Sequence, residues 1–132
     1  MMQTRHLDER HRGALYPVTV VLGAIGQALS TGVKGYLAVL HAGTIISVEM
    51  LADQSGSVVV DVWKDTYANY PPTVADTITA AAKPTISAAD KSTDSTLTGW
   101  TTGVSATNTL RFNVDSCATI TRCTLTLVMT RT

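Results

Sequence analysis

The middle of the chain carries four aspartates whose carboxylates suggest possible chemistry: Asp53, Asp61, Asp65 and Asp76. Together they could bind calcium, a hard cation that takes about six to eight oxygen ligands. Their spacing, however, matches no EF-hand loop. Asp61 alternates with valines in a strand-like run, so an ion pair with a nearby lysine or arginine is the simpler interpretation. We therefore predict no metal site.

Enzymatic chemistry finds little support elsewhere in the sequence. The chain contains no Gly-x-Ser-x-Gly elbow, His-Glu-x-x-His motif, phosphate-binding loop or dinucleotide-binding glycine pattern. His41, the one histidine beyond the N-terminal segment, lies at a predicted turn, where a structural or exposed role is expected. A glycosidase would need two carboxylates about 5 to 9.5 Å apart, and nothing selects Asp61 and Asp65 as such a pair. We predict a protein that is not an enzyme and needs no cofactor.

The first fifteen residues differ from the rest of the chain in their density of charge. One interpretation of residues 1–15 is a tail, since chain termini are usually poorly ordered. The other is an arm that docks on a neighbouring subunit through ion pairs, and two histidines with one aspartate leave metal binding as a third option. The residues of this candidate anchoring arm are Arg5, His6, Asp8, Glu9, Arg10, His11 and Arg12. Residues 16–132 are predicted to form one domain.

Large aromatic residues gather beside Pro71 and Pro72. Trp63 and Trp100 are expected to fill the core. The alternative is an exposed aromatic platform that stacks on sugar rings while neighbouring polar side chains bond hydroxyl groups. Tyrosine is also enriched in protein interfaces, so the same residues suit a contact with another subunit. This candidate interface or glycan platform comprises Trp63, Asp65, Tyr67, Asn69 and Tyr70.

Strand and turn patterns dominate the first half of the domain. Ile46, Val48 and Met50 alternate with polar residues, as in a strand with one buried face. Residues 53–57, DQSGS, are typical of a glycine-containing hairpin connection. The run from Val58 to Trp63 is nearly continuous in its apolar character and predicts a central strand covered on both faces.

The second half begins with a long irregular region and ends in clear strands. Residues 64–96 contain three prolines, and residues 87–96 are predicted to be a polar surface loop. Apolar residues then alternate over 110–114 and 123–129, the period of half-buried strands. The predicted fold is all-β: a two-sheet antiparallel β-sandwich, jelly-roll-like, with about eight strands and a short N-terminal arm.

Composition limits the classes of partner. Hydrophobic residues make up 45% of the chain, charged residues 15%, and the net charge is zero. Direct nucleic-acid binding and polybasic membrane binding both need a surplus of lysine and arginine. No apolar run reaches the length of a membrane span, and residues 1–12 show no secretory signal core. Threonine, about one residue in six, suits the outer faces of β-sheets.

Two cysteines, Cys117 and Cys123, lie six positions apart. On one straight strand they would be about 20 Å apart, at about 3.3 Å per residue. A disulfide tolerates only about 4.4 to 6.8 Å between Cα atoms, so a bridge would require a turn between them. We favour two reduced thiols.

Four sequence pieces carry a resemblance to a known kind of module. They are TGVKGYLAVLHAGTI (31–45), LADQSGSVVVDVWKDTYANYPPT (51–73), LTGWTT (97–102) and LRFNVDSCATITRCTLTLVMTRT (110–132). In order and spacing they resemble a small β-sandwich virion module of tailed bacteriophages, as found in decoration, tail-fibre and receptor-binding proteins. The resemblance implies a jelly-roll-type sandwich and a place in a virion.

From this resemblance we expect a structural protein of the virion that decorates or cements the capsid through contacts between subunits. Other virion proteins, the major capsid protein foremost, are the expected partners. A homo-oligomer is expected, with a trimer as the family-level expectation. The alternative is an adhesion domain of a head fibre or tail fibre that binds a host-surface glycan. No contact with a membrane is expected.

Overall fold

The computed structural model describes residues 13–132. The elements are β1 (Leu15–Gly23), β2 (Gly32–Ala38), β3 (Gly43–Asp65), the short 3₁₀ helices η1 (Tyr67–Asn69) and η2 (Val74–Asp76), β4 (Thr85–Asp94), β5 (Gly103–Val104), β6 (Thr109–Ala118) and β7 (Arg122–Arg131). The charged residues predicted to form the anchoring arm lie outside the described residues. The boundary at residues 15 and 16 stays a prediction.

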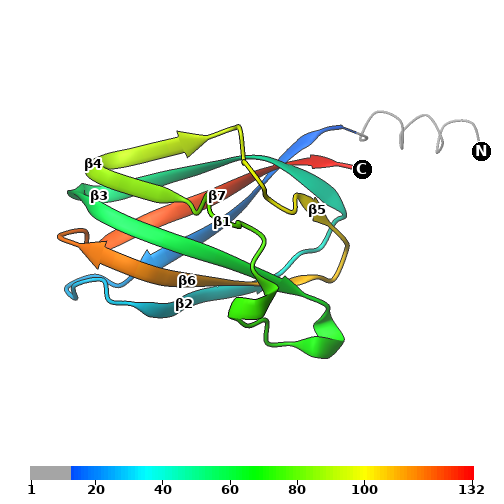
Figure 1. Cartoon of the computed structure of the whole chain (residues 1–132), viewed down its shortest axis with the longest axis horizontal. Helices are drawn as coiled ribbons and strands as arrows, with labels where there is room; N and C mark the ends of the chain where they lie inside the picture. The colour runs from blue at the N-terminus through cyan, green and yellow to red at the C-terminus, as the bar shows by residue number, and fades with distance from the viewer. Residues whose placement is uncertain (1–12) are drawn as a thin grey trace, which may run out of the picture.

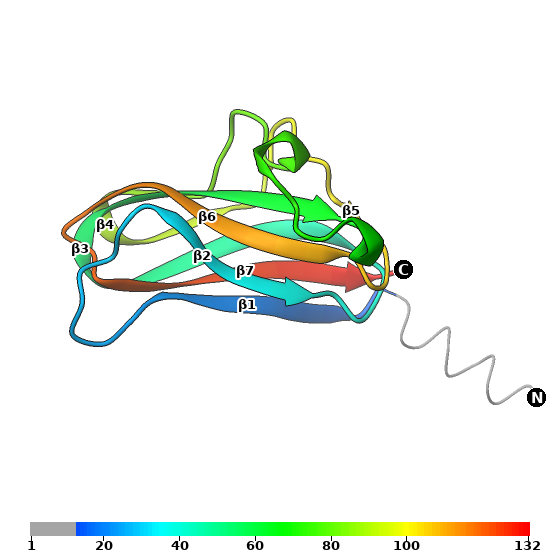
Figure 2. The same ribbon diagram turned by 90° about the horizontal axis from the view of Figure 1, so that it is seen from below.

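The long strand β3 links the two layers of the molecule. Its first half, residues 43–52, pairs with β7, which pairs with β1. Its second half, residues 57–65, pairs with β6, which pairs with β2. Every ladder is antiparallel, and Figures 1 and 2 show β1 and β7 in one layer and β2 and β6 in the other. The predicted all-β sandwich is confirmed, with seven strands among residues 13–132 where about eight were expected.

The core lies between the two layers and is filled by alternate residues of the strands. Because successive side chains of a strand point to opposite faces, the alternation seen in the sequence places one set inside. The inward side chains of the last two strands are Leu110, Phe112 and Val114 of β6 and Cys123, Leu125, Leu127 and Met129 of β7. Each large one contributes about 1.5 to 3 kcal/mol when fully buried.

The hairpin predicted at residues 53–57 is wrong, because β3 continues through this segment. The Asp53 carboxylate serves a different turn: it accepts hydrogen bonds from the backbone N–H groups of Thr121 and Arg122, each at 3.1 Å, and from the Thr121 hydroxyl. These hydrogen bonds lower the pKa of Asp53. Gly56 lies against the same turn, where an added Cβ would come within 2.5 Å of the Ala118 carbonyl oxygen. The polar and glycine residues therefore mark a close approach between strands.

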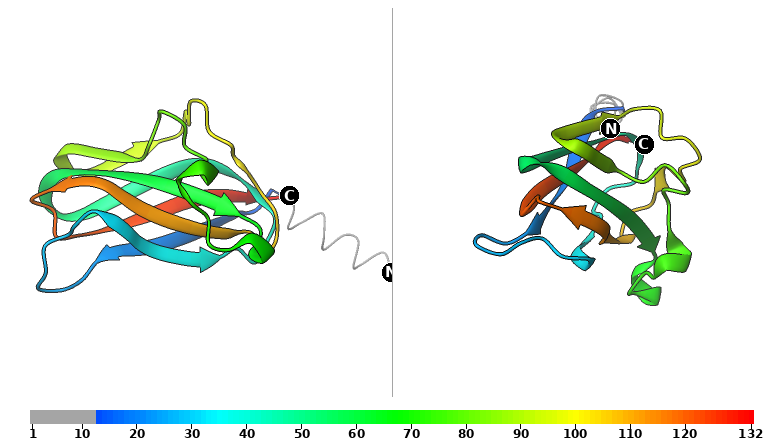
Figure 3. Two further views of the ribbon diagram at one scale, coloured as in Figure 1. Left: turned by 60° about the horizontal axis from the view of Figure 1, so that its bottom comes forward. Right: turned by 60° about the vertical axis from the view of Figure 1, so that its left-hand side comes forward.

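The surface loop predicted over residues 87–96 is also wrong over most of its length, since β4 extends from Thr85 to Asp94. This strand runs along both halves of β3, as Figure 3 shows, and its register shifts opposite Gly56. Only Ile86 of β4 is buried. The strand is held by backbone pairing at the sheet edge, so its side chains lack the apolar alternation that would predict it.

The two outer strands β1 and β2 lie at the ends of the strand order, one in each layer. They approach closely, and a Cβ at Gly35 of β2 would collide with the side chain of Val20 of β1. On the outer face of the β1–β7 pair, the hydroxyls of Thr19 and Thr126 are 2.9 Å apart, in keeping with the threonine-rich exterior. Within residues 13–132 no helix has the length and apolar character needed to cross a membrane.

Candidate functional site

The five residues of the predicted aromatic platform fall into two groups in the structure. Trp63 is near the end of β3 and half-buried, whereas Tyr67 and Tyr70 lie at η1 and just after it and are 74% and 45% exposed. The Thr66 hydroxyl caps η1 by accepting a hydrogen bond from the backbone N–H of Asn69 at 3.3 Å. This short helical turn presents the tyrosines at the surface.

Trp63 belongs to the body of the protein. Its Nε1 donates a hydrogen bond to Oδ2 of Asp61 at 3.0 Å. The guanidinium carbon of Arg111 lies 5.9 Å from the indole centroid, within the range of a cation–π contact. Arg111 in turn donates to the Pro72 carbonyl at 3.2 Å, which ties the proline segment to β6. Through Arg111, Trp63 is thus linked to the loop that follows β3.

Asp65 and Asn69, the two polar residues of the predicted platform, form hydrogen bonds within residues 65–69. Oδ1 of Asp65 accepts from the backbone N–H of Thr66 at 2.7 Å and from the side-chain amide of Asn69 at 3.4 Å. Such local side-chain bonds are typical of residues that shape a turn. Neither residue lines the hollow beside the tyrosines.

Tyr36 of β2, which the sequence analysis did not single out, completes the exposed aromatic group. It is 69% exposed and lines a hollow of about 470 Å³ with Ala38, Tyr67, Tyr70 and Thr109. The alternation of β2 marks Tyr36 as outward-facing. Its proximity to Tyr67 depends on the pairing of β2 with β6 and of β6 with β3, which join segments distant in sequence.

Two further hollows share Ala38 with the first as a lining residue. One, of about 420 Å³, lies between Leu40, Tyr67 and Thr107. The other, of about 280 Å³, lies between β1 and the end of β2. We call these three hollows together the β2 track. It is lined by Tyr16, Pro17, Val18, Thr19, Tyr36, Leu37, Ala38, Val39, Leu40, His41, Tyr67, Tyr70, Thr107 and Thr109.

The β2 track is an apolar and aromatic surface with hydroxyl groups as its main polar atoms. Leu40 is 79% exposed although it is strongly apolar. Contiguous exposed apolar surface of this kind marks sites of contact with other molecules. The chemistry that these side chains offer is packing, aromatic stacking and hydrogen bonding.

His41, the histidine predicted at a turn, lines the track and is exposed. Its carbonyl accepts a hydrogen bond from the Tyr16 hydroxyl at 2.9 Å, and its Nδ1 lies 3.5 Å from Nη2 of Arg131. Burial raises the pKa of Tyr16. These contacts join the 38–43 turn to the start of β1 and the end of β7.

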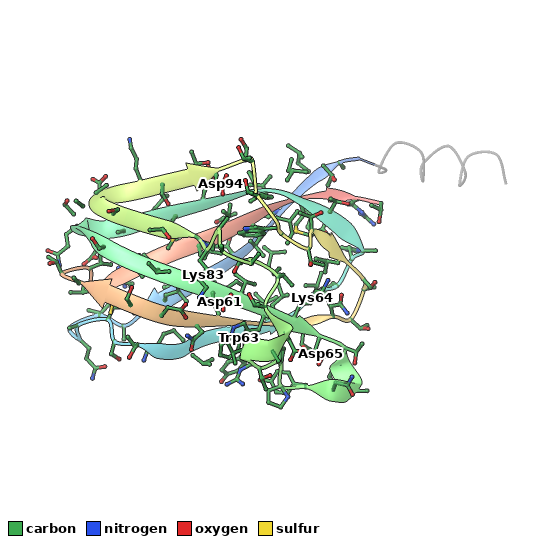
Figure 4. The ribbon with its side chains drawn as sticks, viewed as in Figure 1. Asp61, Trp63, Lys64, Asp65, Lys83 and Asp94 are labelled. Carbon is green, nitrogen blue, oxygen red and sulfur yellow. The ribbon has the colours of Figure 1, made fainter. Side chains whose placement is uncertain are left out.

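A second cluster surrounds Asp61, which is only 2% exposed. Its Oδ1 accepts hydrogen bonds from the hydroxyls of Thr77 at 2.6 Å and Thr79 at 2.8 Å. The Lys83 ammonium lies 3.9 Å from Oδ2, so the predicted ion pair of Asp61 is confirmed (Figure 4). Lys83 also bonds Asp115 at 2.6 Å, and this hydrogen bond raises the pKa of Lys83.

The four predicted carboxylates do not come together as a metal site. Asp53 caps the β6–β7 turn, Asp61 faces the threonines, and Asp76 accepts from the backbone N–H of Thr73 at 2.7 Å. Residues 13–132 hold no group of three or more histidine, cysteine, aspartate or glutamate side chains that could bind a metal ion.

Both cysteines are free thiols. Cys117 donates to the carbonyl of Leu29 at 3.2 Å. Cys123 is buried in the core, and desolvation raises the pKa of its thiol to about 11. Trp100, as predicted, is part of the core, and its Nε1 donates to the Ala82 carbonyl at 2.8 Å.

Comparison with known proteins identifies the fold. No family model matches the chain, and no curated protein matches it by sequence. Among solved structures, a chain from the capsid of Ralstonia phage GP4 is similar with a TM-score of 0.52 and 13% identity, over 92% of this chain and 86% of that one. A chain of the nora virus structure is more distant, with a TM-score of 0.34, 14% identity, and coverage of 89% of this chain and 55% of that one.

The likeness to the Ralstonia phage GP4 capsid chain extends over nearly the whole of both chains. It shows that the two share the arrangement of a small β-sandwich. At this level of identity it defines a class of fold, in agreement with the sandwich that the sequence predicts.

Proposed function

We propose that this protein is a structural component of a tailed-bacteriophage virion that decorates or cements the capsid through contacts between subunits. The observation that carries the proposal is the likeness of nearly the entire chain to a chain of a phage capsid. A neutral, threonine-rich exterior and an exposed apolar track are consistent with a subunit that packs among others. The function lies in binding and rigidity, without chemistry.

The sandwich would act as the rigid part of the cement. Its core and antiparallel ladders would give the subunit a rigid body. The residues predicted to anchor it, Arg5 to Arg12, precede Gly13 in the sequence, and the backbone N–H of Gly13 bonds Arg131, which contacts His41 of the β2 track. A subunit that binds the assembled shell stabilises it by mass action, because bound partners shift the equilibrium toward the state that binds them. The major capsid protein is the proposed partner, and a trimer the proposed oligomer.

Labelling of intact virions tests this function. Gold-conjugated antibody against the protein, imaged by electron microscopy, is expected to cover the head at regular sites. Label on the tail or on projecting fibres alone would contradict capsid decoration while retaining a place in the virion. Purified virions without label, and without peptides of the protein by mass spectrometry, would contradict the proposal as a whole.

The glycan-binding alternative stays a prediction with a narrower site. Asp65 and Asn69 already bond each other, so Tyr36, Tyr67 and Tyr70 with the nearby threonine hydroxyls remain as the stacking surface. Loss of host-cell binding by the Tyr67→Ala, Tyr70→Ala double variant, with normal incorporation into virions, would favour adhesion over cementing.

A further inference from the structure

The N-terminal segment enters the sandwich at one end of the β2 track. The backbone N–H of Gly13 donates to the Arg131 carbonyl at 2.8 Å, and the N–H of Arg131 donates to the Ala14 carbonyl at 2.9 Å. Arg131 also contacts His41, which lines the track, and Tyr16 of the track is three residues from Gly13. The described part of the chain therefore begins beside this surface, and residues 1–12 precede it in the sequence.

The direction of the backbone at this point favours a neighbouring copy over the same copy. Gly13 and Ala14 keep the pairing of β1 with β7, so the described part of the chain begins in line with β1, at the end of the sandwich. Figure 1 places the start of β1, the C-terminus and η1 toward the same end of the molecule. Twelve extended residues reach about 40 Å, at about 3.3 Å each, which is enough to cross to an adjacent subunit.

The chemistry of residues 1–12 suits the track. Exposed tyrosine rings attract guanidinium groups through their electron-rich faces, and this segment carries three arginines: Arg5, Arg10 and Arg12. Leu7 and the two leading methionines supply apolar side chains for the hollow beside Leu40. Asp65, two residues before Tyr67, adds a negative charge, and its hydrogen bonds to Thr66 and Asn69 are both accepted by Oδ1.

We propose that the β2 track of one copy binds residues 1–12 of a neighbouring copy, with arginines over the rings of Tyr36 and Tyr67 and Leu7 in the apolar hollow at Leu40. The proposal rests on the inter-subunit role given to the arm in the proposed function. It identifies the surface that the arm binds. Each copy carries both an arm and a track, so the same contact can repeat from one copy to the next. Head-to-tail contacts of this kind close into rings when the rotation permits.

Photo-cross-linking of the full chain tests the exchange directly. Leu7 is replaced by the photoreactive amino acid p-benzoylphenylalanine in unlabelled protein, which is mixed with a large excess of ¹⁵N-labelled wild-type protein and irradiated. Mass spectrometry then locates the cross-link and reports the isotope of the acceptor peptide. We expect cross-links to residues 36–41 or 67–70, mostly on ¹⁵N peptides. Acceptor peptides of natural isotope would show that a copy binds its own arm, and cross-links elsewhere, or none, would also overturn the proposal.

Variants of the track give the matched comparison. Leu40→Ser with Tyr67→Ala in the ¹⁵N copy should lower cross-linking by about tenfold or more, a loss of about 1.4 kcal/mol in binding. Ile25→Ser removes an equally exposed apolar side chain, in the loop between β1 and β2, outside the track, and should leave cross-linking unchanged. Equal loss in both variants would contradict the assignment.

The cross-linking experiment and the virion-labelling experiment can fail independently of each other. Cross-links between copies of a protein that is absent from virions would retain the arm exchange and overturn the virion role. A protein found on the capsid without cross-links between copies would retain the virion role and overturn the arm exchange.

Discussion

The cluster around Asp61 and the β2 track are opposite in character, although both adjoin the segment that follows β3. Asp61 is buried and each of its oxygens has a partner in Thr77, Thr79, Trp63 or Lys83. The track rests on core residues, but Tyr36, Leu40 and Tyr67 within it are 69%, 79% and 74% exposed.

This contrast separates stability from function. Buried polar groups persist when they are fully bonded, and such a network specifies one arrangement of the chain. Leucine and tyrosine side chains that stay largely exposed add little to the stability of the fold, so their grouping on one surface favours a contact with another molecule. We therefore expect changes in the cluster to alter stability and changes in the track to alter assembly.

The largest effect is expected from Asp61→Ala. The variant leaves the indole N–H of half-buried Trp63 and the hydroxyls of buried Thr79 and exposed Thr77 without their acceptor. It also removes the carboxylate beside Lys83, and each buried group left unsatisfied costs about 1 to 3 kcal/mol. We expect the free energy of unfolding in urea to fall by about 3 kcal/mol or more. Asp90→Ala removes an exposed carboxylate and should change stability by less than about 0.5 kcal/mol. A similar fall in both would contradict a special role for the cluster.

A smaller loss is expected from Gly56→Ala. The added Cβ would lie 2.5 Å from the Ala118 carbonyl oxygen and 2.9 Å from the Ile120 side chain, so β3 must move away from the β6–β7 turn. Overpacking of this kind costs about 1 to 3 kcal/mol, measurable by thermal or urea denaturation. Gly103→Ala is the control, because nothing lies within 4 Å of its added Cβ. A stable Gly56→Ala protein would show that the two strands separate easily.

The pH dependence of stability should report on Asp53. Hydrogen bonds from Thr121 and Arg122 lower the pKa of this carboxyl in the folded state relative to its ordinary value. A lowered folded-state pKa contributes stability above the unfolded-state pKa, and this contribution is lost as the pH falls through the folded-state value. Urea denaturation between pH 7 and pH 3 should show a smaller acid loss for Asp53→Asn than for the wild type. Equal slopes would exclude Asp53 as a source of acid sensitivity.

The smallest effect on stability is expected at the track itself. Tyr67→Ala removes a side chain that is 74% exposed, so the free energy of unfolding should change by no more than about 0.5 kcal/mol. Incorporation into virions should nevertheless decrease. A large loss of stability would mean that Tyr67 supports the fold and would remove the distinction between the two regions.

The parts of the fold that the sequence predicts are those with a regular pattern. β7 alternates over Arg122–Thr130 and β6 over Leu110–Val114, because one face is core and the other is not, and both strands form as expected. β4 lacks this pattern because only Ile86 is buried, and residues 53–57 mislead because glycine and polar residues occur both in turns and where two strands approach closely.

The candidate site was predictable only in part. Tyr67 and Tyr70 stand out beside the prolines, and the structure places both at the surface. Trp63 and Asp65 have other partners, in Asp61 and in Thr66 and Asn69, and no sequence pattern reveals these contacts. Tyr36 resembles any outward residue of a strand until β6 brings β2 beside the end of β3.

The sequence by itself determined that the chain is an all-β sandwich with a neutral exterior. Both features follow from the alternation of apolar residues and from composition, which can be read without knowing which strands pair. The tertiary structure alone decided that Asp53 caps a turn 68 residues away, that Asp61 is buried under threonines, and that three tyrosines share one surface. These features depend on which strands become neighbours. That choice is made by the packing of the whole core, and no local stretch of sequence encodes it.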